Sequence, residues 1–167
     1  MVILTISILI FISGCIGIGG NQTYSSNGIS FNYPGGWYKT PGQGNVNVSD
    51  IDIPVIVTVG DKFNEETGVL VLLANNNTSG EISTGSIKAA IGKYGFLMSE
   101  GKVTVDGVSA HEFVYNTTLS GGTVKKERLI LFEKNQAQYI LIFTALPGDF
   151  EGQETNFKMI QNSFKVQ

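Results

Sequence analysis

The chain has 167 residues, of which 14 are acidic and 11 are basic, so its formal net charge is −3 at pH 7. This acidic balance, without a stripe of lysine and arginine, excludes a nucleic-acid partner. The single histidine and single cysteine exclude a zinc site built from several such ligands, and the sequence therefore predicts no metal and no cofactor.

The first 14 residues predict a lipoprotein signal peptide. Residues 2–12 form an apolar run, broken only by Thr5 and Ser7, that ends in Ile12-Ser13-Gly14-Cys15. A short apolar segment followed by small residues is typical of a secretory signal. This ending resembles the lipobox of prokaryotic lipoproteins, in which the cysteine sulfur receives diacylglycerol, so we expect lipidation of Cys15.

Two alternatives for this segment stay open. One is an uncleaved membrane anchor, since the apolar stretch through Ile18 approaches the ~20 residues that span a bilayer. The other, which is weaker, is a buried core strand. No lysine or arginine precedes Lys39, which is unusual for a signal peptide.

Residues 15–22 predict a lipidated, flexible tether, because they are rich in glycine and uncharged polar residues. Residues 23–167 have the length of a single domain. Lipidation of Cys15 would leave the mature chain without a free thiol, which excludes cysteine catalysis, a disulfide and a thiolate metal site.

The segment that follows the tether is crowded with aromatic residues around a Pro-Gly-Gly sequence. Residues 29–33 alternate as a strand, Pro34-Gly35 predicts a type II turn, and Trp37 and Tyr38 begin a returning strand. Two interpretations are open: an aromatic platform for a ligand, or the packed corner of a β-hairpin. We favour the corner, because buried aromatic rings dominate protein cores.

Two strands are predicted next. Residues 51–59 alternate between apolar and mostly polar positions, which predicts a strand with one buried side, and Pro54 favours an edge position for it. Residues 68–73 are apolar throughout and suit a strand that is buried on both faces.

The spacing then changes to that of a helix. Residues 83–99 predict an amphipathic helix, in which one face carries Ile87, Ala90, Ile91, Tyr94 and Met98. Asp106-Gly107 predicts a type I′ turn that joins strands 103–105 and 108–118.

Residues 123–133 and 137–146 predict a second strand pair, and the later strand is apolar on both faces, so we place it at the centre of the sheet. Residues 149–164 return to helical spacing, with one apolar stripe formed by Phe150, Phe157, Ile160 and Phe164.

This order of elements predicts an α+β domain with a mainly antiparallel sheet. Strands that are apolar on both faces need helices on both sides, which gives an α/β/α sandwich with a central sheet, preceded by an N-terminal β-hairpin.

Residues 24–37 resemble the opening of PsbP-like domains, which reads aromatic-x-x-x-G-F/I-x-F-x-Y-P-x-G-W. The ending also resembles that family: residues 139–145, Pro147 and a helix that closes on Asn162-Ser163-Phe164-Lys165-Val166. The resemblance implies the same α/β/α sandwich. PsbP helps to hold inorganic cofactors at photosystem II in plants, but here a lipoprotein signal stands in place of a transit peptide, so that role is not transferred.

Candidate glycosylation acceptors occur in five Asn-x-Ser/Thr triplets, at Asn21, Asn47, Asn76, Asn77 and Asn116. We expect these asparagines on loops. The simpler interpretation is turn formation, because asparagine tolerates left-handed backbone conformations.

Few charged residues suggest chemistry. The segment Lys125-Lys126-Glu127-Arg128 alternates on a strand, and we interpret it as a solvated sheet edge or as a docking patch for a partner. His111 is expected to be an ordinary, partly buried histidine, with a weak metal contact shared with Glu112 as the alternative.

The acidic residues occur in three clusters, which we expect to lie on solvated loops: Asp50/Asp52, Glu65/Glu66 and Asp149/Glu151/Glu154.

We therefore expect a lipid-anchored, non-catalytic binding or assembly module on the outer face of the cytoplasmic membrane, which it contacts through the lipid on Cys15. Its second partner would be an unidentified protein or envelope component. One alternative is a surface binder of carbohydrate or another small ligand that uses Tyr33, Trp37 and Tyr38. The other is a hydrolase, which needs two carboxylates converging in one pocket.

Overall fold

The computed structural model describes residues 20–48, 50–75, 82–119 and 121–167. Cys15, Asn76 and Asn77 lie outside these ranges. The strands and helices before the centre of the chain are β1 (Gln22–Ser26), β2 (Ile29–Tyr33), β3 (Trp37–Pro41), β4 (Asn45–Val48), β5 (Ile51–Asp61), β6 (Gly68–Asn75) and α1 (Thr84–Tyr94). Those that follow are β7 (Gly95–Val105), β8 (Val108–Thr118), β9 (Val124–Lys134), β10 (Ala137–Ala145), the 3-10 helix η1 (Phe150–Gln153), α2 (Glu154–Ser163) and β11 (Lys165–Val166).

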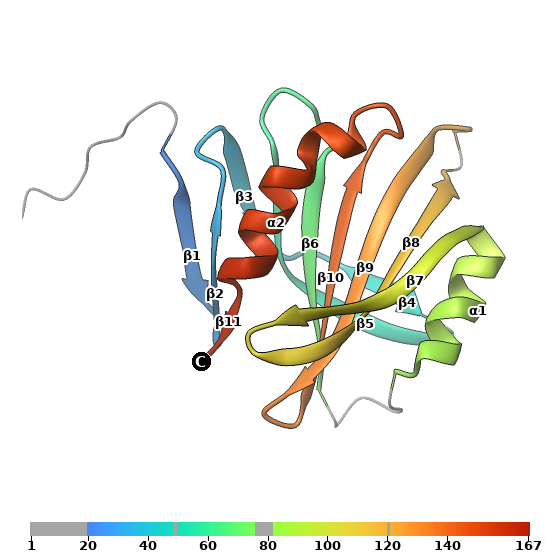
Figure 1. Ribbon diagram of the computed structural model, residues 1–167, viewed down its shortest axis with the longest axis horizontal. Coiled ribbons are helices and arrows are strands. Elements are labelled where there is room, and N and C mark those ends of the chain that lie inside the picture. The colour runs from blue at the N-terminus through green and yellow to red at the C-terminus, as the bar shows by residue number, and fades with distance from the viewer. Residues whose placement is uncertain (1–19, 49, 76–81, 120) are drawn as a thin grey trace, which may run out of the picture.

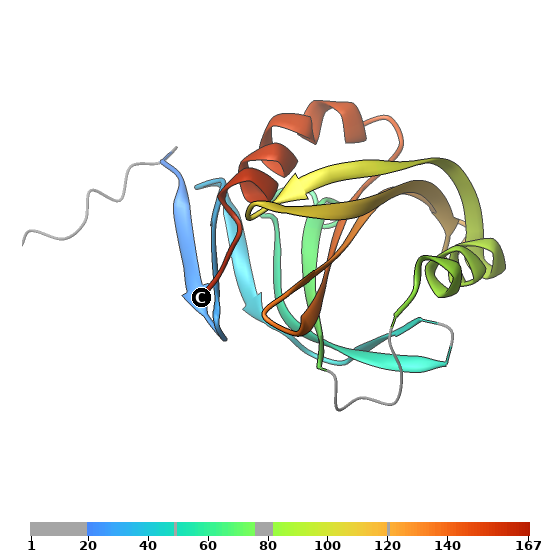
Figure 2. The same cartoon turned by 60° about the horizontal axis from the view of Figure 1, so that its bottom comes forward.

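An eight-stranded antiparallel sheet dominates the molecule, with the order β3-β5-β6-β10-β9-β8-β7 and with β4 paired to β5. Figure 2 shows that this sheet curves strongly. A small sheet, β1-β2-β11, lies beside it and joins the two ends of the domain.

Helices cover both sides of the curved sheet, as the sequence predicted. Phe157 and Ile160 of α2 pack on one side, called here the α2 face, and Ile87 and Ile91 of α1 pack on the other, the α1 face. The central strand β10 contributes to both, since Leu141 lies in the first cluster and Ile140 in the second. The expected α+β sandwich with a central, mainly antiparallel sheet is confirmed.

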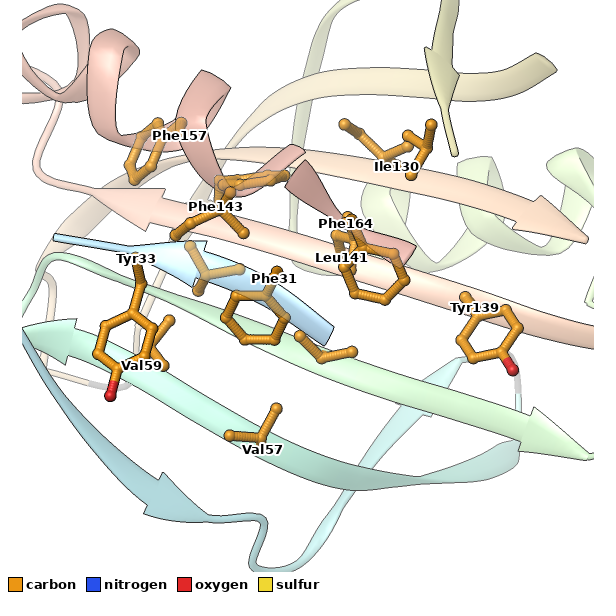
Figure 3. Packing of buried hydrophobic residues seen from close by; sticks show 14 of the residues in the cluster. Phe31, Tyr33, Val57, Val59, Ile130, Tyr139, Leu141, Phe143, Phe157 and Phe164 are labelled. Carbon is orange, nitrogen blue, oxygen red and sulfur yellow. The ribbon is translucent and has the colours of Figure 1, made fainter. Parts of the chain in front are cut away.

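The core under α2 is built from aromatic rings (Figure 3). Phe164 stacks on Phe31 with the ring centroids 5.9 Å apart and meets Phe132 edge-on at 5.8 Å. Phe157 packs against Phe143 and Phe150. Full burial of such a ring stabilises the fold by roughly 1.5–3 kcal/mol, so the predicted stripe along residues 149–164 is confirmed as the helix side that closes this core.

Three tight turns match their sequences. Asp106 and Gly107 both have positive φ, as the type I′ prediction requires, and so do Asn27 and Gly28 between β1 and β2. Asn135 and Gln136 adopt the same left-handed conformation between β9 and β10. The hairpins β7–β8 and β9–β10 are therefore confirmed, and β10 is an interior strand as expected.

The helix predicted for residues 83–99 is too long. It begins after the N-cap Ser83, whose side chain accepts from the Ser86 amide, and it ends at Tyr94. Residues from Gly95 onward form β7, because the backbone of Gly95 lies against Asn116: a Cβ at Gly95 would stand 2.0 Å from the Asn116 carbonyl oxygen. Met98 therefore lies on a strand and is half exposed.

The predicted hairpin through Pro34 and Trp37 is also wrong. Trp37 N donates to Pro34 O, which puts Pro34 at the first position of the turn, and Gly35 does not have positive φ. This turn carries the chain from the small sheet to the main sheet, where β3 pairs with β5. The N-terminal hairpin is instead β1–β2, so Gln22 belongs to a strand and not to the predicted tether.

Strand β5 is paired on both sides only from Val57 to Gly60, by β3 and β6, so the edge position predicted from Pro54 holds at that residue but not for the whole strand. At Pro54 itself only β4 lies alongside, with Asn45 as its partner. A bulge between Val55 and Val57 then divides the strand: Val55 packs on the α1 face and Val57 on the α2 face. The predicted single buried side is thus split between two cores.

Candidate functional site

A small pocket lies between α1, β4 and the α1 face of the sheet, with a volume of about 110 Å³. We call it the α1 pocket. The helix supplies one wall, β4 a second, and the floor comes from β8, β9 and β10. Its lining residues are Val46, Asn47, Val48, Ile87, Ala90, Ile91, Tyr94, Tyr115, Thr117, Glu127, Leu129 and Ile142.

The pocket is mostly apolar, and its polar lining residues are Asn47, Tyr115, Thr117 and Glu127, the last of which belongs to β9. Strand alternation puts Glu127 on the same face as Leu129, which is buried in the α1 core. Sheet register then fixes its neighbours, because Tyr115 of β8 and Thr144 of β10 lie directly opposite it on either side. Glu127 thus stands in the middle of the sheet, beneath α1.

Burial raises the pKa of the Glu127 carboxyl, and the Tyr115 hydroxyl, the charge of Lys125 and the hydroxyls of Thr117 and Thr144 lower it by less. The hydroxyls of Thr117 and Thr144 are buried and lack a partner at hydrogen-bonding geometry. Burial and the adjacent Glu127 raise the pKa of Tyr115 well above its ordinary value. Such a group of incompletely paired polar atoms beside an apolar cavity is suited to binding a small polar head.

A second, more open cleft of about 380 Å³ lies over the β7–β8 hairpin near the start of α1. Lys88 and Glu100 form a salt bridge across it, and His111 lines it together with Lys102 and Phe113. His111 is exposed, which corrects the expected partial burial, because the cleft keeps its side of β8 open to solvent.

The basic segment of β9 is not a sheet edge, since β8 and β10 flank it. Lys125 pairs with Glu66, Lys126 with Glu151, and Arg128 with Glu112 and Glu154, at 2.5–3.4 Å. The three basic side chains are only 12–17% exposed. The predicted docking patch is therefore largely neutralised and covered, because the β5–β6 loop, β8, η1 and α2 each bring an acidic residue onto it.

The rings of the predicted aromatic corner are buried as expected, although the turn joins two sheets and forms no hairpin, and the aromatic platform is not found. Trp37 is buried and meets Phe157 edge-on at 6.3 Å, and Tyr33 is buried as well. Neither ring is available to a ligand at the surface, which corrects the assignment of Trp37 to a ligand surface. Tyr38, the next residue along the strand, is exposed.

The paired carboxylates do not gather into a site. Asp52 accepts from the Asn47 side chain on the surface, while Glu151 and Glu154 are engaged by Lys126 and Arg128. Within the described ranges no group of three His, Cys, Asp or Glu side chains is placed to hold a metal ion. The residues lining the α1 pocket include one carboxylate, whereas paired-acid hydrolysis requires two.

The asparagines of the candidate glycosylation triplets differ in their surroundings. Asn21 is exposed just before β1. Asn47 is exposed on β4 and not on a loop, and its side-chain oxygen accepts from the Asp50 amide. Asn116 lies inside β8, partly buried, with its side-chain oxygen enclosed and unpaired, so the loop expected at that position is wrong.

A comparison with protein-family models matches residues 19–166 to the PsbP-like protein family. The chain belongs to this family. Its fold is similar to that of the cyanobacterial PsbP of Synechocystis sp. PCC 6803 (TM-score 0.64, 18% identity, covering 92% of this chain and 96% of that one). No curated protein matches the chain.

Two further solved structures are more distant from this PsbP-like protein. One is LpqN of Mycobacterium tuberculosis, described as involved in cell envelope biogenesis (TM-score 0.47, 11% identity, covering 90% of this chain and 92% of that one). The other is a putative regulator of unknown function from Pseudomonas aeruginosa (TM-score 0.46, 16% identity, covering 84% and 92%).

Sequence reasoning missed Glu127 because it treated residues 125–128 of this PsbP-like protein as one solvated segment. The available signal was alternation: Glu127 shares its strand face with Leu129 and Leu131, so a carboxylate continues an apolar series. What covers that face is decided by α1, about 35 residues earlier in the chain.

Proposed function

We propose that this PsbP-like protein is a non-catalytic binding module, held at the outer face of the cytoplasmic membrane by lipid on Cys15, and that the α1 pocket receives its ligand. The observation that carries the ligand site is the partly buried Glu127 carboxylate in the lining of a mostly apolar cavity. The lipobox-like sequence Ile12-Ser13-Gly14-Cys15 supports the anchor.

The chemistry of the pocket defines the class of ligand. Its apolar walls from Ile87, Ile91 and Leu129 favour a short aliphatic or aromatic group, and its size limits that group to a few heavy atoms. The Glu127 carboxylate accepts from a cationic or hydrogen-bond-donating head, and the hydroxyls of Tyr115 and Thr117 lie beside it in the pocket lining. A carbohydrate ring, polar on its whole perimeter, fits these walls poorly.

The pocket is tested by NMR titration of the 15N-labelled protein with n-butylammonium, whose four-carbon chain matches the small volume. We expect changes in amide chemical shift that are concentrated in α1 and β4. The apparent affinity for n-butylammonium should be at least tenfold weaker in Glu127→Gln. Glu133→Gln, an exposed position on the same strand, is the matched control. Butyrate should produce no such shifts, because its charge repels Glu127. Shifts spread evenly over the domain, or unchanged in Glu127→Gln, would count against the pocket.

The anchor is tested separately by intact mass and membrane fractionation in the native host, comparing wild type with Cys15→Ser. We expect a mature wild-type chain that begins at a lipid-bearing Cys15 and a variant that leaves the membrane fraction. An unprocessed chain that stays in the membrane in both proteins would refute lipidation and favour an uncleaved anchor.

A further inference from the structure

The loops at one end of the molecule lie where the tether joins the domain, and we call this the tether end. Gly20 touches Gly35, since a Cβ there would stand 1.9 Å from the Gly20 carbonyl oxygen. The Gln22 side chain donates to Gly35 O and Trp37 O, which ties the small sheet to the start of β3.

The tether end extends across the main sheet, as the pairing of the strand termini shows. The paired strand termini are Trp37 with Asp61, Gly60 with Gly68, Gly68 with Thr144, Lys126 with Ala145, Val124 with Thr118 and Gly95 with Thr117. The loops β5–β6, β8–β9 and β10–η1 therefore lie together at the upper end in Figure 1, and the C-terminus lies at the opposite end.

Large apolar side chains are exposed at this end. Every exposed large hydrophobic residue in the described ranges lies in a loop of the tether end or within four residues of a strand terminus there: Tyr38, Phe63, Tyr94, Phe96, Met98, Leu119 and Val124. Phe63 is 88% exposed at the tip of the β5–β6 loop and Phe96 is 72% exposed. The opposite end instead carries the polar turns Asn27-Gly28, Asp106-Gly107 and Asn135-Gln136.

We propose that the tether end rests on the lipid surface, with Phe63 and Leu119 inserted among the headgroups and Phe96 at the margin of the contact. The proposal rests on the membrane anchor proposed above. Only four residues lie between Cys15 and Gly20, and a fully extended chain over these five Cα–Cα steps reaches about 18 Å. Lipid on Cys15 and an uncleaved apolar segment both keep this end next to the bilayer.

The side chains suit an interface. Lys62 Nζ lies 5.9 Å from the centroid of the Phe63 ring, and an aromatic ring at headgroup level beside a lysine that reaches the phosphates is characteristic of interfacial contacts. Of the other lysines near this end, Lys125 and Lys126 are paired with Glu66 and Glu151, while Lys39 and Lys93 lie 6.0 Å and 5.1 Å from the centroids of the Tyr24 and Tyr94 rings. Apolar contact and not net charge therefore holds the orientation, and the contact should be insensitive to salt.

The orientation also has a consequence for the ligand. Tyr94 lines the α1 pocket and belongs to the exposed apolar residues of the tether end. The pocket would then open close to the membrane surface, where small amphiphiles partition. A ligand with an apolar body and a polar head would reach the pocket from the bilayer without crossing bulk water.

The test uses the full-length protein reconstituted into phosphatidylcholine vesicles with bromine near the headgroup end of the acyl chains. Tryptophan is placed at Phe63→Trp, at Leu119→Trp and, as control at the opposite end, at the exposed Ser109→Trp. The buried Trp37 is a constant background in all three proteins. We expect at least twofold stronger quenching for the first two variants than for Ser109→Trp, unchanged in 0.5 M salt.

Equal quenching of Phe63→Trp and Ser109→Trp in vesicle-bound protein would overturn the orientation and leave the anchor intact. Protein that fails to float with the vesicles would overturn both. If Phe63→Trp and Leu119→Trp stay unquenched in lipid vesicles but are shielded from iodide in native membranes, the tether end binds a protein, and the lipid contact is wrong.

Discussion

Asp106 offers a quantitative test of how the C-terminus is held in place. Its side chain is only 7% exposed, and its carboxylate accepts from Lys134, from Lys165 at 3.0 Å and from the Val166 amide at 2.9 Å. Burial raises the pKa of this carboxyl, but the three donors outweigh it and lower the pKa to about 2. One residue thereby links the β7–β8 turn, the end of β9 and β11.

The substitution Asp106→Asn removes the charge and preserves the turn, because asparagine tolerates the positive φ at this position. A shift from 3.8 to about 2 corresponds to about 2.4 kcal/mol in the free energy of unfolding. Solvent screening near the surface reduces this to about 1–2 kcal/mol. We expect Asp106→Asn to lose that amount at pH 7.

The sign of the pH dependence follows from the lowered pKa. The stabilisation is complete above the unfolded-state pKa near 4 and is lost as the pH falls through the folded-state pKa near 2. The difference between wild type and Asp106→Asn should therefore fall by about half at pH 3 and below about 0.5 kcal/mol near pH 2. Urea unfolding of both proteins at several pH values measures this difference in the free energy of unfolding. A difference that is absent at pH 7, or that is the same at pH 7 and pH 2, would refute the reasoning.

Three further predictions concern the core, the sheet and the pocket. Phe164→Ala should cost about 3–5 kcal/mol in urea unfolding, whereas the exposed Tyr38→Ala should stay within about 0.5 kcal/mol; similar losses would contradict the described core. Gly95→Ala should lower the free energy of unfolding by about 1–3 kcal/mol, because the new Cβ meets the Asn116 carbonyl. It should also increase hydrogen exchange of the amides that pair β7 with β8. Glu127→Gln should raise the free energy of unfolding at pH 7 and lose that gain below the ordinary glutamate pKa, since burial raises the pKa of this carboxyl; a loss at pH 7 would mean that the charge is well paired.

Prediction from sequence succeeded where a local pattern had one structural solution. Asp106-Gly107 needs a left-handed turn, so the β7–β8 connection followed directly. The stripe from Phe150 to Phe164 has only a helical interpretation. Residues 95–99 had two, because Phe96 and Met98 fit a helix continued from Tyr94 as well as an alternating strand, and the pairing of Gly95 with Thr117 decided in favour of the strand.

The sequence by itself determined the types of most elements, the two-sided apolar character of β10 and the burial of the rings at the aromatic corner, because these depend on periodicity and turn chemistry within a few residues. Only the tertiary structure decided the surroundings of each charge. It paired Arg128 with Glu112 of β8 and Glu154 of α2, placed Glu127 beneath α1 and gathered Phe63 and Leu119 at the tether end. Alternation fixes which side of a strand a residue occupies, but the segment that covers that side comes from a distant part of the chain.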